Sequence, residues 1–417
     1  MNITKENFRK AFLIFCWGLY DLANQFFALN IVSLYFVRWI TIEKATPEIF
    51  YGIAFGISTF FIAISGPVLG AISDTLNRRR PFLIYLTLLS VIFTIILGAS
   101  DNIFVALLFF IVANFGCQTA TVFYNALMVN IAPKDKIGLV SGIGKMLSYS
   151  GAILALYFIK PVVLKSGYRA TFLPTGILFL IFSLPCLIFI KDQGEKRQIN
   201  LISFLKKDKI REIFTGLKAS IFGPHTIPGL SNFLKASLFG FCVVNTVILF
   251  MSIYATKAFK LNEIQITNLI AFSTFFAMVG SFISGYISDR LGSKATLIAT
   301  FILWIISLSL GAIVKNANLF WLVGSLVGLS LGATWVVTRA LVMQLVPAEK
   351  TGEVFGLFNF VGYISSIIGS LFWGLILLFF APLGETGYRL ALLSLNLFLA
   401  IGLIFVLRLP KANNQVS

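Results

Sequence analysis

Long apolar runs occupy most of the chain, and charges, prolines and glycines separate them. The runs lie at 11–38, 50–73, 81–99, 102–131, 138–160, 169–190, 232–256, 264–288, 295–313, 317–346, 352–380 and 387–408. A helix of about 20 residues crosses the hydrocarbon core of a bilayer. The runs lack the two-residue alternation of a membrane barrel, and lipid offers irregular backbone no hydrogen-bond partners. We therefore expect twelve transmembrane helices.

The composition agrees with this pattern. Of the 417 residues, 58% are hydrophobic and 12% are charged, whereas a soluble domain has about 25% charged residues. With a mean hydropathy of +0.93, the chain has too few charges to cover a water-exposed surface, which excludes a soluble enzyme. Twelve spans of about 20 residues use about 240 residues, so we expect no large domain outside the membrane.

The formal charge of +17 would suggest nucleic-acid binding in a soluble protein. Here the basic residues cluster in short connections, where their bias toward the cytoplasm explains them better, so we expect no nucleic-acid partner. More than twice as many lie on the side of the two termini as on the other side. Both termini are therefore expected in the cytoplasm of a multi-pass cell-membrane protein. Lys5, Arg9 and Lys10 precede an apolar run that continues to about Trp39, which indicates an uncleaved first span.

Residues typical of catalytic and metal sites are scarce. Cys16, Cys117, Cys186 and Cys242 lie singly in apolar stretches, without a CxxC motif, so neither a disulfide nor a structural zinc site is indicated. The one histidine, His225, lies in a connection, which favours an ordinary loop residue over a proton relay. No GxxxxGK[ST] motif supports ATP-driven pumping. We expect no enzyme, no metal and no cofactor.

The longest connection, residues 191–231, divides the predicted helices into two sets of six. We expect an N-terminal half over 1–190 and a C-terminal half over 232–417. Within the connection, apolar residues recur at helical spacing over 199–221 with basic residues between them. This pattern predicts an amphipathic helix on the cytoplasmic membrane surface, and a solvated linker with chance periodicity is the alternative.

The two halves contain the same local patterns at nearly equal separations. Residues 126–142 read ALMVNIAPKDKIGLVSG and residues 340–356 read ALVMQLVPAEKTGEVFG, while GAISDTLN at 70–77 corresponds to GYISDRLG at 285–292. Each pair keeps its place within its half, so the halves are parallel repeats. This arrangement resembles the major facilitator superfamily. It implies an all-α membrane protein with twelve transmembrane helices in two pseudo-symmetric halves of six.

The loops after the second and eighth spans combine small, acidic and basic residues. They contain Gly70, Asp74, Arg78 and Arg79 in the first half, and Gly285, Asp289, Arg290, Gly292 and Lys294 in the second. Small residues let helices approach closely, and a carboxylate can accept hydrogen bonds from a helix N-terminus and pair with arginine. We expect a cytoplasmic gate; a topology marker with a helix stop is the alternative. The loops resemble the superfamily signature, except for Thr75 and Asn77 where arginine and glycine are usual.

Ionisable residues inside the spans are the candidates for the transport site. A charge within the bilayer is costly and usually functional. Asp21 is the one carboxylate clearly inside a predicted span, and Arg339 holds the repeat position of Asn125. We expect a substrate-binding or coupling site from Tyr20, Asp21, Asn24, Tyr124, Asn125, Lys145 and Arg339. Lys145 either faces this site or extends to the surface, as Lys235 is expected to do. A structural ion pair is the alternative for Asp21 and Arg339.

Several segments resemble one branch of the superfamily. Residues 17–24, WGLYDLAN, resemble the W-x-x-Y-D-x-A-N opening of the vacuole effluxer-like transporters, which include autophagy-related amino-acid effluxers. Residues 123–127, FYNAL, are similar to the span-four pattern of this branch. Segments within 141–151 and 338–347 resemble its S-G-x-G…G-Y-x-G and S-R-S…P patterns. The resemblance implies amino-acid transport.

Three departures from the branch concern the solute and not the fold. Met128 follows FYNAL where a proline is expected, and Lys145 replaces an aromatic or small residue. Before Asn245, the seventh span has Val243 and Val244 preceded by Cys242, without the Asp-Gly that the branch tends to have. A missing carboxylate and an added cation leave both an amino acid and a small organic anion open.

The leading hypothesis is a monomeric secondary transporter that moves a small polar solute, an amino acid or a small organic anion, by alternating access. Burial favours the protonated form of Asp21 unless a nearby cation opposes it, so we expect proton coupling through Asp21. The planar, permanently charged guanidinium of Arg339 suits an anionic group of the solute. Two alternatives stay open. One is an exporter of amphipathic drugs or lipids, suggested by the 44 phenylalanines, and the other is a transport-dead scaffold or sensor.

Overall fold

The computed structural model describes residues 2–193, 215 and 227–410. In these residues twelve helices are long and apolar enough to cross a membrane, which confirms the predicted all-α fold. The described residues contain no β-strand. The predicted surface helix over 199–221, apart from Thr215, and His225 lie outside the described residues.

The first six spans begin with a continuous run of four helical segments. These are α1 (Asn2–Phe27), the π-helical segment η1 (Ala28–Leu34), α2 (Tyr35–Arg38) and the π-helical segment η2 (Trp39–Glu43). The following elements are α3 (Glu48–Leu76), α4 (Arg80–Ile95), η3 (Ile96–Gly98), α5 (Ile103–Ala126), η4 (Leu127–Asn130), α6 (Ile137–Ser166), η5 (Arg169–Thr171) and α7 (Phe172–Phe189). The first span therefore extends past the predicted range of 11–38 at both ends: α1 begins earlier, at Asn2, and the π-helical segment η2 continues the span to Glu43.

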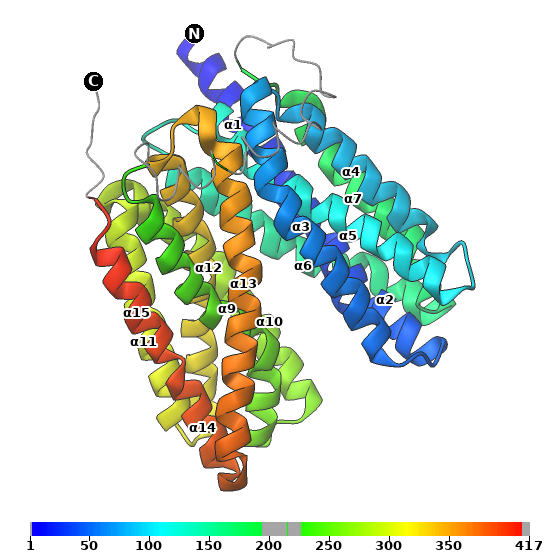
Figure 1. The fold of residues 1–417 in the computed structure, drawn as a ribbon, viewed down its shortest axis with the longest axis vertical. Helices are drawn as coiled ribbons and strands as arrows, with labels where there is room; N and C mark the ends of the chain where they lie inside the picture. The colour runs from blue at the N-terminus through cyan, green and yellow to red at the C-terminus, as the bar shows by residue number, and fades with distance from the viewer. Residues whose placement is uncertain (1, 194–214, 216–226, 411–417) are drawn as a thin grey trace. The chain divides into compact units, whose positions relative to one another are not determined.

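The last six spans are built from the helices of the second half of the chain (Figure 1). They consist of α9 (Leu230–Phe259), α10 (Glu263–Leu291), α11 (Ser293–Ile313), α12 (Ala317–Leu345), η7 (Ala348–Lys350), α13 (Thr351–Phe380), η8 (Ala381–Leu383), α14 (Glu385–Ser394) and α15 (Asn396–Leu407). The twelfth span is formed by α14 and α15 together.

The helices form two compact units. Unit 1 comprises 1–133, 143–217 and 347–360, and unit 2 comprises 134–142, 218–346 and 361–417. Each unit thus contains the first turns of one helix whose remaining turns belong to the other unit: α13 in unit 1 and α6 in unit 2. The domain boundaries predicted at 190 and 232 stay a prediction, since these units follow a different division of the chain.

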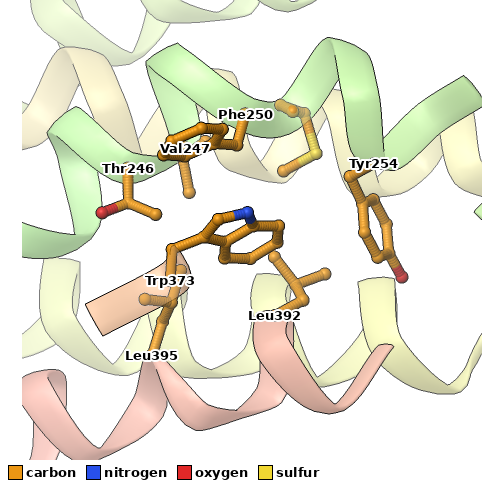
Figure 2. A pocket seen from close by; sticks show the side chains of 8 residues that line it. Thr246, Val247, Phe250, Tyr254, Trp373, Leu392 and Leu395 are labelled. Carbon is orange, nitrogen blue, oxygen red and sulfur yellow. The ribbon is translucent and has the colours of Figure 1, made fainter. Parts of the chain in front are cut away.

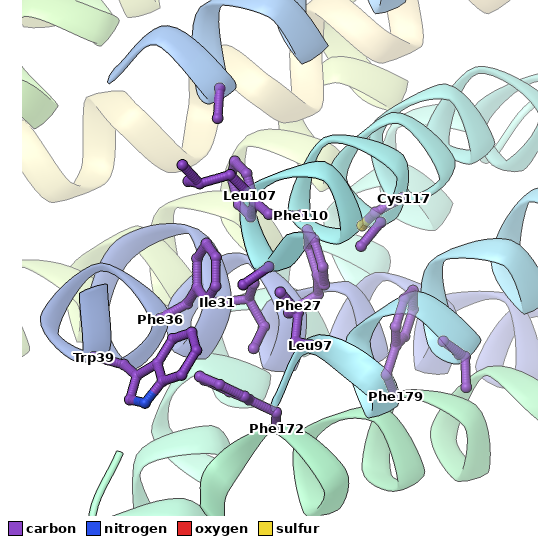
Figure 3. Packing of buried hydrophobic residues seen from close by; sticks show 14 of the residues in the cluster. Phe27, Ile31, Phe36, Trp39, Leu97, Leu107, Phe110, Cys117, Phe172 and Phe179 are labelled. Atoms are coloured by element: carbon purple, nitrogen blue, oxygen red, sulfur yellow. The ribbon is translucent and has the colours of Figure 1, made fainter. Parts of the chain in front are cut away.

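An aromatic cluster fixes the first span inside unit 1 (Figure 3). Phe36 stacks on Phe110 of α5 with ring centroids 5.0 Å apart, and Trp39 packs edge-on against Phe172 of α7 at 5.5 Å. All four side chains are buried. Because aromatic pairs of this kind add to the gain from burial, they hold the first span in register against α5 and α7.

Small residues bring α10 and α12 together inside unit 2. A Cβ atom added to Gly324 would lie 2.9 Å from Ser273 Oγ, and one added to Gly332 would lie 2.7 Å from Ser281 Oγ. With Gly328 between them, these glycines recur every four residues and form one face of α12. Close approach along such a face is typical of membrane helices, and it holds the part of α12 that leads to Arg339.

Candidate functional site

Three aromatic residues of the predicted site region pack against one another in unit 1. Trp17 Nε1 donates to the backbone oxygen of Tyr124 at 3.0 Å, and the two rings stack at 4.6 Å. The ring of Tyr20 stacks on Tyr124 at 4.9 Å, and its hydroxyl shares a 2.6 Å hydrogen bond with Thr87. The structure thus brings Tyr20 and Tyr124 together as expected, and this stack holds α1 against α5.

Lys145 points toward Asp21 and does not extend to the membrane surface. Its Nζ lies 3.5 Å from Asp21 Oδ1, and the two side chains are 18% and 6% exposed. The helices that carry them, α6 and α1, are close because of glycines. A Cβ atom on Gly18 would lie 2.5 Å from Leu147 Cδ1, and one on Gly151 would lie 2.6 Å from the Leu22 oxygen. The pair is therefore a buried ion pair between two helices.

Further polar groups follow Asp21 along α1. Asn24 Oδ1 accepts a weak hydrogen bond from Cys117 Sγ at 3.8 Å, and Gln25 Nε2 donates to Ser148 Oγ at 2.9 Å. Sequence reasoning missed Gln25, although its spacing of four residues from Asp21 places it near the same helix face. On α5, Asn125 is 9% exposed and its Oδ1 is buried with no hydrogen-bond partner among the described residues.

Arg339 is buried in α12 of unit 2. The residue is 5% exposed and lies in a buried stretch from Val336 to Val342. The hydroxyl of the preceding Thr338 donates to the Thr334 oxygen of its own helix at 2.6 Å. A permanently charged guanidinium inside a membrane-spanning helix is costly and normally serves a function.

The first repeated loop caps a helix that begins far along the chain. Asp74 Oδ1 accepts from the backbone N of Gly352 at 3.1 Å, and Oδ2 accepts from that of Glu353 at 2.8 Å, both in the first turn of α13. Arg79 donates to the same carboxylate through Nη2 at 2.8 Å and Nε at 3.1 Å, and it also donates to the Ala348 oxygen. The positive end of the helix dipole and the guanidinium both favour the carboxylate here.

The second loop repeats this capping in unit 2. Asp289 Oδ1 accepts from the backbone N of Gly138 at 2.6 Å, and Oδ2 accepts from that of Leu139 at 2.7 Å. Arg290 does not repeat the role of Arg79, since its guanidinium lies 4.4 Å from the ring centre of Tyr286. Lys294 donates to the Leu407 oxygen at 2.8 Å. The repeated element is therefore the aspartate on a helix N-terminus and not an acid–base pair.

Glycines permit both caps. A Cβ atom on Gly352 would lie 2.8 Å from the Gly70 oxygen and from Asp74 Oδ1. In the other loop, a Cβ atom on Gly138 would lie 2.8 Å from Asp289 Oδ1. After each aspartate the chain turns through a residue with positive φ, Asn77 with φ 52° and ψ 39° and its repeat counterpart Gly292 with φ 88° and ψ 145°. Asparagine tolerates the left-handed helical conformation found at position 77, which explains why Asn77 can stand where glycine is usual.

Sequence reasoning missed two acids near the first cap. Asp192, at the start of the long connection, accepts hydrogen bonds from the backbone N of Arg79 at 3.0 Å and of Arg80 at 3.1 Å. Glu353, in the first turn of α13, is 9% exposed. The repeat alignment could have singled out Glu353, because it places this carboxyl opposite Leu139.

An apolar pocket lies elsewhere in unit 2, between α9, α13 and the twelfth span (Figure 2). Two of its polar lining groups are engaged within the protein: Thr246 Oγ1 donates to the Cys242 oxygen and Tyr254 OH to the Gly311 oxygen, each at 2.6 Å. The pocket has no room for a water molecule. It therefore offers nothing to a polar solute. In the described part of the chain, no three or more His, Cys, Asp or Glu side chains gather as metal ligands would.

Comparison with known proteins agrees with this architecture. The family model described as Major Facilitator Superfamily matches residues 22–370 and, in a second match, 233–417. An uncharacterized protein of Aquifex aeolicus is 26% identical over 404 residues, which cover 96% of this chain and 97% of that protein. The uncharacterized MFS-type transporter YxiO of Bacillus subtilis is 24% identical over 417 residues, covering 95% of this chain and 94% of that protein.

Two further matches are partial or structural. The proton-coupled antiporter flippase LtaA of Staphylococcus aureus is 28% identical over 162 residues, which cover 38% of this chain and 41% of that protein. The crystal structure of the human organic anion transporter MFSD10 (TETRAN) matches with a TM-score of 0.73 at 13% identity, covering 95% of this chain and 99% of that chain. At that identity the likeness shows a shared fold.

Proposed function

This chain belongs to the major facilitator superfamily, and from that premise we propose that it transports a small polar solute, an amino acid or a small organic anion. Its family indicates a multi-pass membrane transporter rather than an enzyme. The solute, its coupling and the roles of individual residues form the proposal. We further propose that it acts as a monomer in the cell membrane with both termini in the cytoplasm.

The observation that carries the choice of solute is the burial of three charges inside spans. Asp21 and Lys145 form an ion pair whose side chains are 6% and 18% exposed, and Arg339 is 5% exposed. Such charges are costly in a membrane protein unless they serve a function. The planar fork of Arg339 suits a carboxylate or phosphate, and the structural neighbour MFSD10 is an organic anion transporter. The vacuole effluxer-like segments support an amino acid.

Gating forms the second part of the proposal. Asp74 and Asp289 each cap the N-terminus of a helix from the other sequence half. We assign these caps to the cytoplasmic gate, which forms when the transporter faces outward and breaks when it faces inward. Arg79 strengthens the first cap. The gating roles of Arg78 and Arg290 stay a prediction.

Proton coupling through Asp21 is the third part. The carboxyl is buried beside Lys145, so a solute anion that attracts the ammonium would favour the protonated form of Asp21. The proton-coupled antiporter among the relatives supports this coupling. With Asp21→Asn, accumulation driven by a pH gradient should disappear while solute exchange continues. Persistent accumulation in this variant would show that another ion, or none, drives transport.

The test of the solute class is uptake by purified protein in liposomes. Radiolabelled alanine, glutamate and succinate are compared with tetraphenylphosphonium, an apolar cation. Uptake of one of the first three, with most affinity lost in Arg339→Lys, supports the proposal, because lysine lacks the bidentate fork. Unchanged affinity in Arg339→Lys would contradict the anion-site assignment. Uptake of the apolar cation alone would favour export of amphipathic compounds, the candidate that the flippase match supports.

A further inference from the structure

Asp192, at the start of the long connection, caps a helix from a distant part of the sequence. Its Oδ1 accepts from the backbone N of Arg79 at 3.0 Å and from that of Arg80 at 3.1 Å, and its Oδ2 accepts from the latter at 3.2 Å. The first N–H groups of a helix have no partners within the helix, and the residue before α4 provides no side-chain cap. Asp192 therefore takes the place of the missing N-cap, where a carboxylate is also favoured by the helix dipole.

This cap acts on the arginine of the first gate contact. Arg79 stands immediately before α4, which begins at Arg80. From this position its Nη2 and Nε donate to Asp74 Oδ1 at 2.8 Å and 3.1 Å, and the guanidinium also donates to the Ala348 oxygen in the turn before α13. Only 8% of the Arg79 side chain is exposed. One residue thus carries both contacts: its backbone N meets Asp192, and its side chain joins α3 to the turn before α13.

The second half has the same loop but a different start of the following helix. The separation of the two loops places Lys294 opposite Arg79. Because α11 begins at Ser293, Lys294 already lies within the helix, and its Nζ donates to the Leu407 oxygen at the end of the twelfth span. No acidic residue follows the twelfth span in residues 408–417. In this half, therefore, the basic residue of the loop serves the last span.

The two differences between the halves belong together. In the second half α11 begins at the residue after Gly292, whereas α4 begins later, with Arg78 and Arg79 between Asn77 and the helix. An N-cap fixes where a helix begins and how the chain enters it. A carboxylate at this N-terminus fixes the late start of α4, which leaves the Arg79 side chain outside the helix and within reach of Asp74.

We propose that Asp192 is a positioning residue of the cytoplasmic gate, whose cap on α4 holds Arg79 against Asp74 while the gate is closed. The first residues of the long connection therefore belong to the gate of the first half. Withdrawing the carboxylate frees the N-terminus of α4 to rearrange, weakens the contact between Arg79 and Asp74, and favours the open gate. The inference rests on the gate role proposed for Asp74.

Neighbouring contacts fasten the same segment without Arg79. Gln193 Nε2 donates to the Asn130 oxygen at 2.9 Å, and Asn130 Nδ2 donates to the Lys191 oxygen at 3.0 Å. These bonds hold the start of the connection to η4, at the end of the fourth span. Gln193→Ala therefore provides a matched control, because it loosens the segment and leaves the cap on α4 in place.

The test follows gate opening with a single cysteine. Ser73→Cys is the reporter, because Ser73 is buried beside Asp74, and the four native cysteines are replaced by serine. The rate of maleimide labelling is measured in lipid nanodiscs at low maleimide concentration, where it follows the fraction of protein with an open gate. The reporter protein, Asp192→Ala, Arg79→Gln and the combined variant form a double-mutant cycle.

Asp192→Ala should raise the labelling rate about fivefold, the shift in an equilibrium that the loss of one helix cap causes. Arg79→Gln should raise it as well, and in that background Asp192→Ala should add less than about twofold, because the residue that it positions is gone. Gln193→Ala should leave the rate unchanged. No increase in Asp192→Ala, an equal increase with and without Arg79, or the same increase in Gln193→Ala would overturn the proposal.

Two further substitutions at Asp192 keep the test informative. Asparagine is as good an N-cap as aspartate, so Asp192→Asn should label as slowly as the reporter protein, and rapid labelling would contradict a capping role. Threonine is a weaker cap, and Asp192→Thr replaces the alanine variant in the cycle if that variant is poorly folded. If Asp74→Asn leaves labelling unchanged, the gate role itself fails and this inference with it. If Asp74→Asn raises labelling but Asp192→Ala and Asp192→Thr do not, only the role of Asp192 fails.

Discussion

Arg389 donates from Nη1 to the backbone oxygen of Ala312 at 2.8 Å, joining the start of the twelfth span to the last turn of α11. The guanidinium also reaches the Ala258 oxygen near the end of α9 at 3.4 Å, and it lies 5.0 Å from the ring centre of Phe259. One side chain, 10% exposed, thus caps the carbonyl ends of two helices. Cations are favourable at such ends because the helix dipole is negative there.

We predict that Arg389→Leu destabilises the protein by about 2 kcal/mol or more, because hydrogen bonds to a charged group contribute about that much and buried carbonyls lose their donor. Thermal unfolding of the purified protein measures the effect. Arg408→Leu is the control, since Arg408 is exposed and its guanidinium lies over Phe405 at 5.9 Å. Equal melting temperatures for the two variants would show that the capping contacts contribute little.

Hydrogen bonds from basic side chains to the last backbone oxygens of a helix occur in both units. Arg169, at the start of η5, donates to the Gly98 oxygen at the end of η3 at 2.7 Å. Arg80 donates to the Leu187 oxygen at 2.8 Å, as Lys294 does to that of Leu407. From the sequence, Lys294 belongs to an expected gate loop, and the two arginines are only charges in connections. Their capping role needs the positions of carbonyl groups on other helices, which no local pattern contains.

The fold was predictable because it follows from length, hydropathy and repetition. The twelve long apolar runs predict the twelve helices, because a long apolar segment in lipid has no other stable structure. The repeat likewise placed Asp74 and Asp289 at equivalent helix ends. That each aspartate accepts hydrogen bonds at a helix end could be anticipated, but not from which donors: Glu353 N lies 279 residues from Asp74, and Leu139 N lies 150 residues from Asp289.

The first gate also depends on a glycine contact that can be tested separately. A side chain on Gly352 would press against the Gly70 oxygen and Asp74 Oδ1, and overpacking of this kind costs about 1–3 kcal/mol. We predict that Gly352→Ala opens the Asp74 contact. A single cysteine introduced by Ser73→Cys, at a position that is buried beside Asp74, should then react with maleimide several-fold faster. Gly362→Ala, on the same helix but with nothing within 4 Å, should leave labelling unchanged. Similar labelling in both variants would show that close approach is not required.

A pH effect is expected outside the spans, at Asp101. A hydrogen bond from Lys44, and the charges of Arg169 and Lys44, hold the pKa of Asp101 below its ordinary value. A lowered pKa means that the ionised form stabilises the folded state at pH values above the ordinary pKa, and that this contribution disappears as the pH falls below about 4. Asp101→Asn should therefore lower the melting temperature slightly near neutral pH and leave it unchanged in acid. A difference that persists in acid would point to a steric cause.

The site could be predicted only in part. The sequence placed Tyr20, Asp21 and Tyr124 correctly among the buried polar and aromatic residues of the spans. It could not decide the direction of Lys145, because a lysine several residues inside a span can extend to the surface or turn inward with equal ease. The close packing at Gly18 and Gly151 determines the direction of Lys145, because this packing brings α6 to the face of α1 that carries Asp21.

The buried pair of Asp21 and Lys145 allows a quantitative prediction. Their Nζ–Oδ1 distance of 3.5 Å is long beside the 2.8 Å of Arg79 and Asp74, so we expect a moderate interaction. A double-mutant cycle with Asp21→Asn, Lys145→Met and the combined variant should give a coupling energy of about 1 kcal/mol, within the usual range for contacting residues. Thermal or denaturant unfolding supplies the four stabilities.

Lys235 provides the matched control for this cycle, because it is exposed at the start of α9, over the ring of Phe405 at 5.5 Å. Lys235→Met should be nearly neutral and should add to Asp21→Asn without coupling. If the Asp21–Lys145 coupling energy is also near zero, the ion pair contributes nothing to the stability of the protein without solute. A role of Lys145 in binding the solute would then be favoured over a role in stability. A coupling well above 1 kcal/mol would instead indicate a fixed structural pair, because a solute anion could not displace it at modest cost.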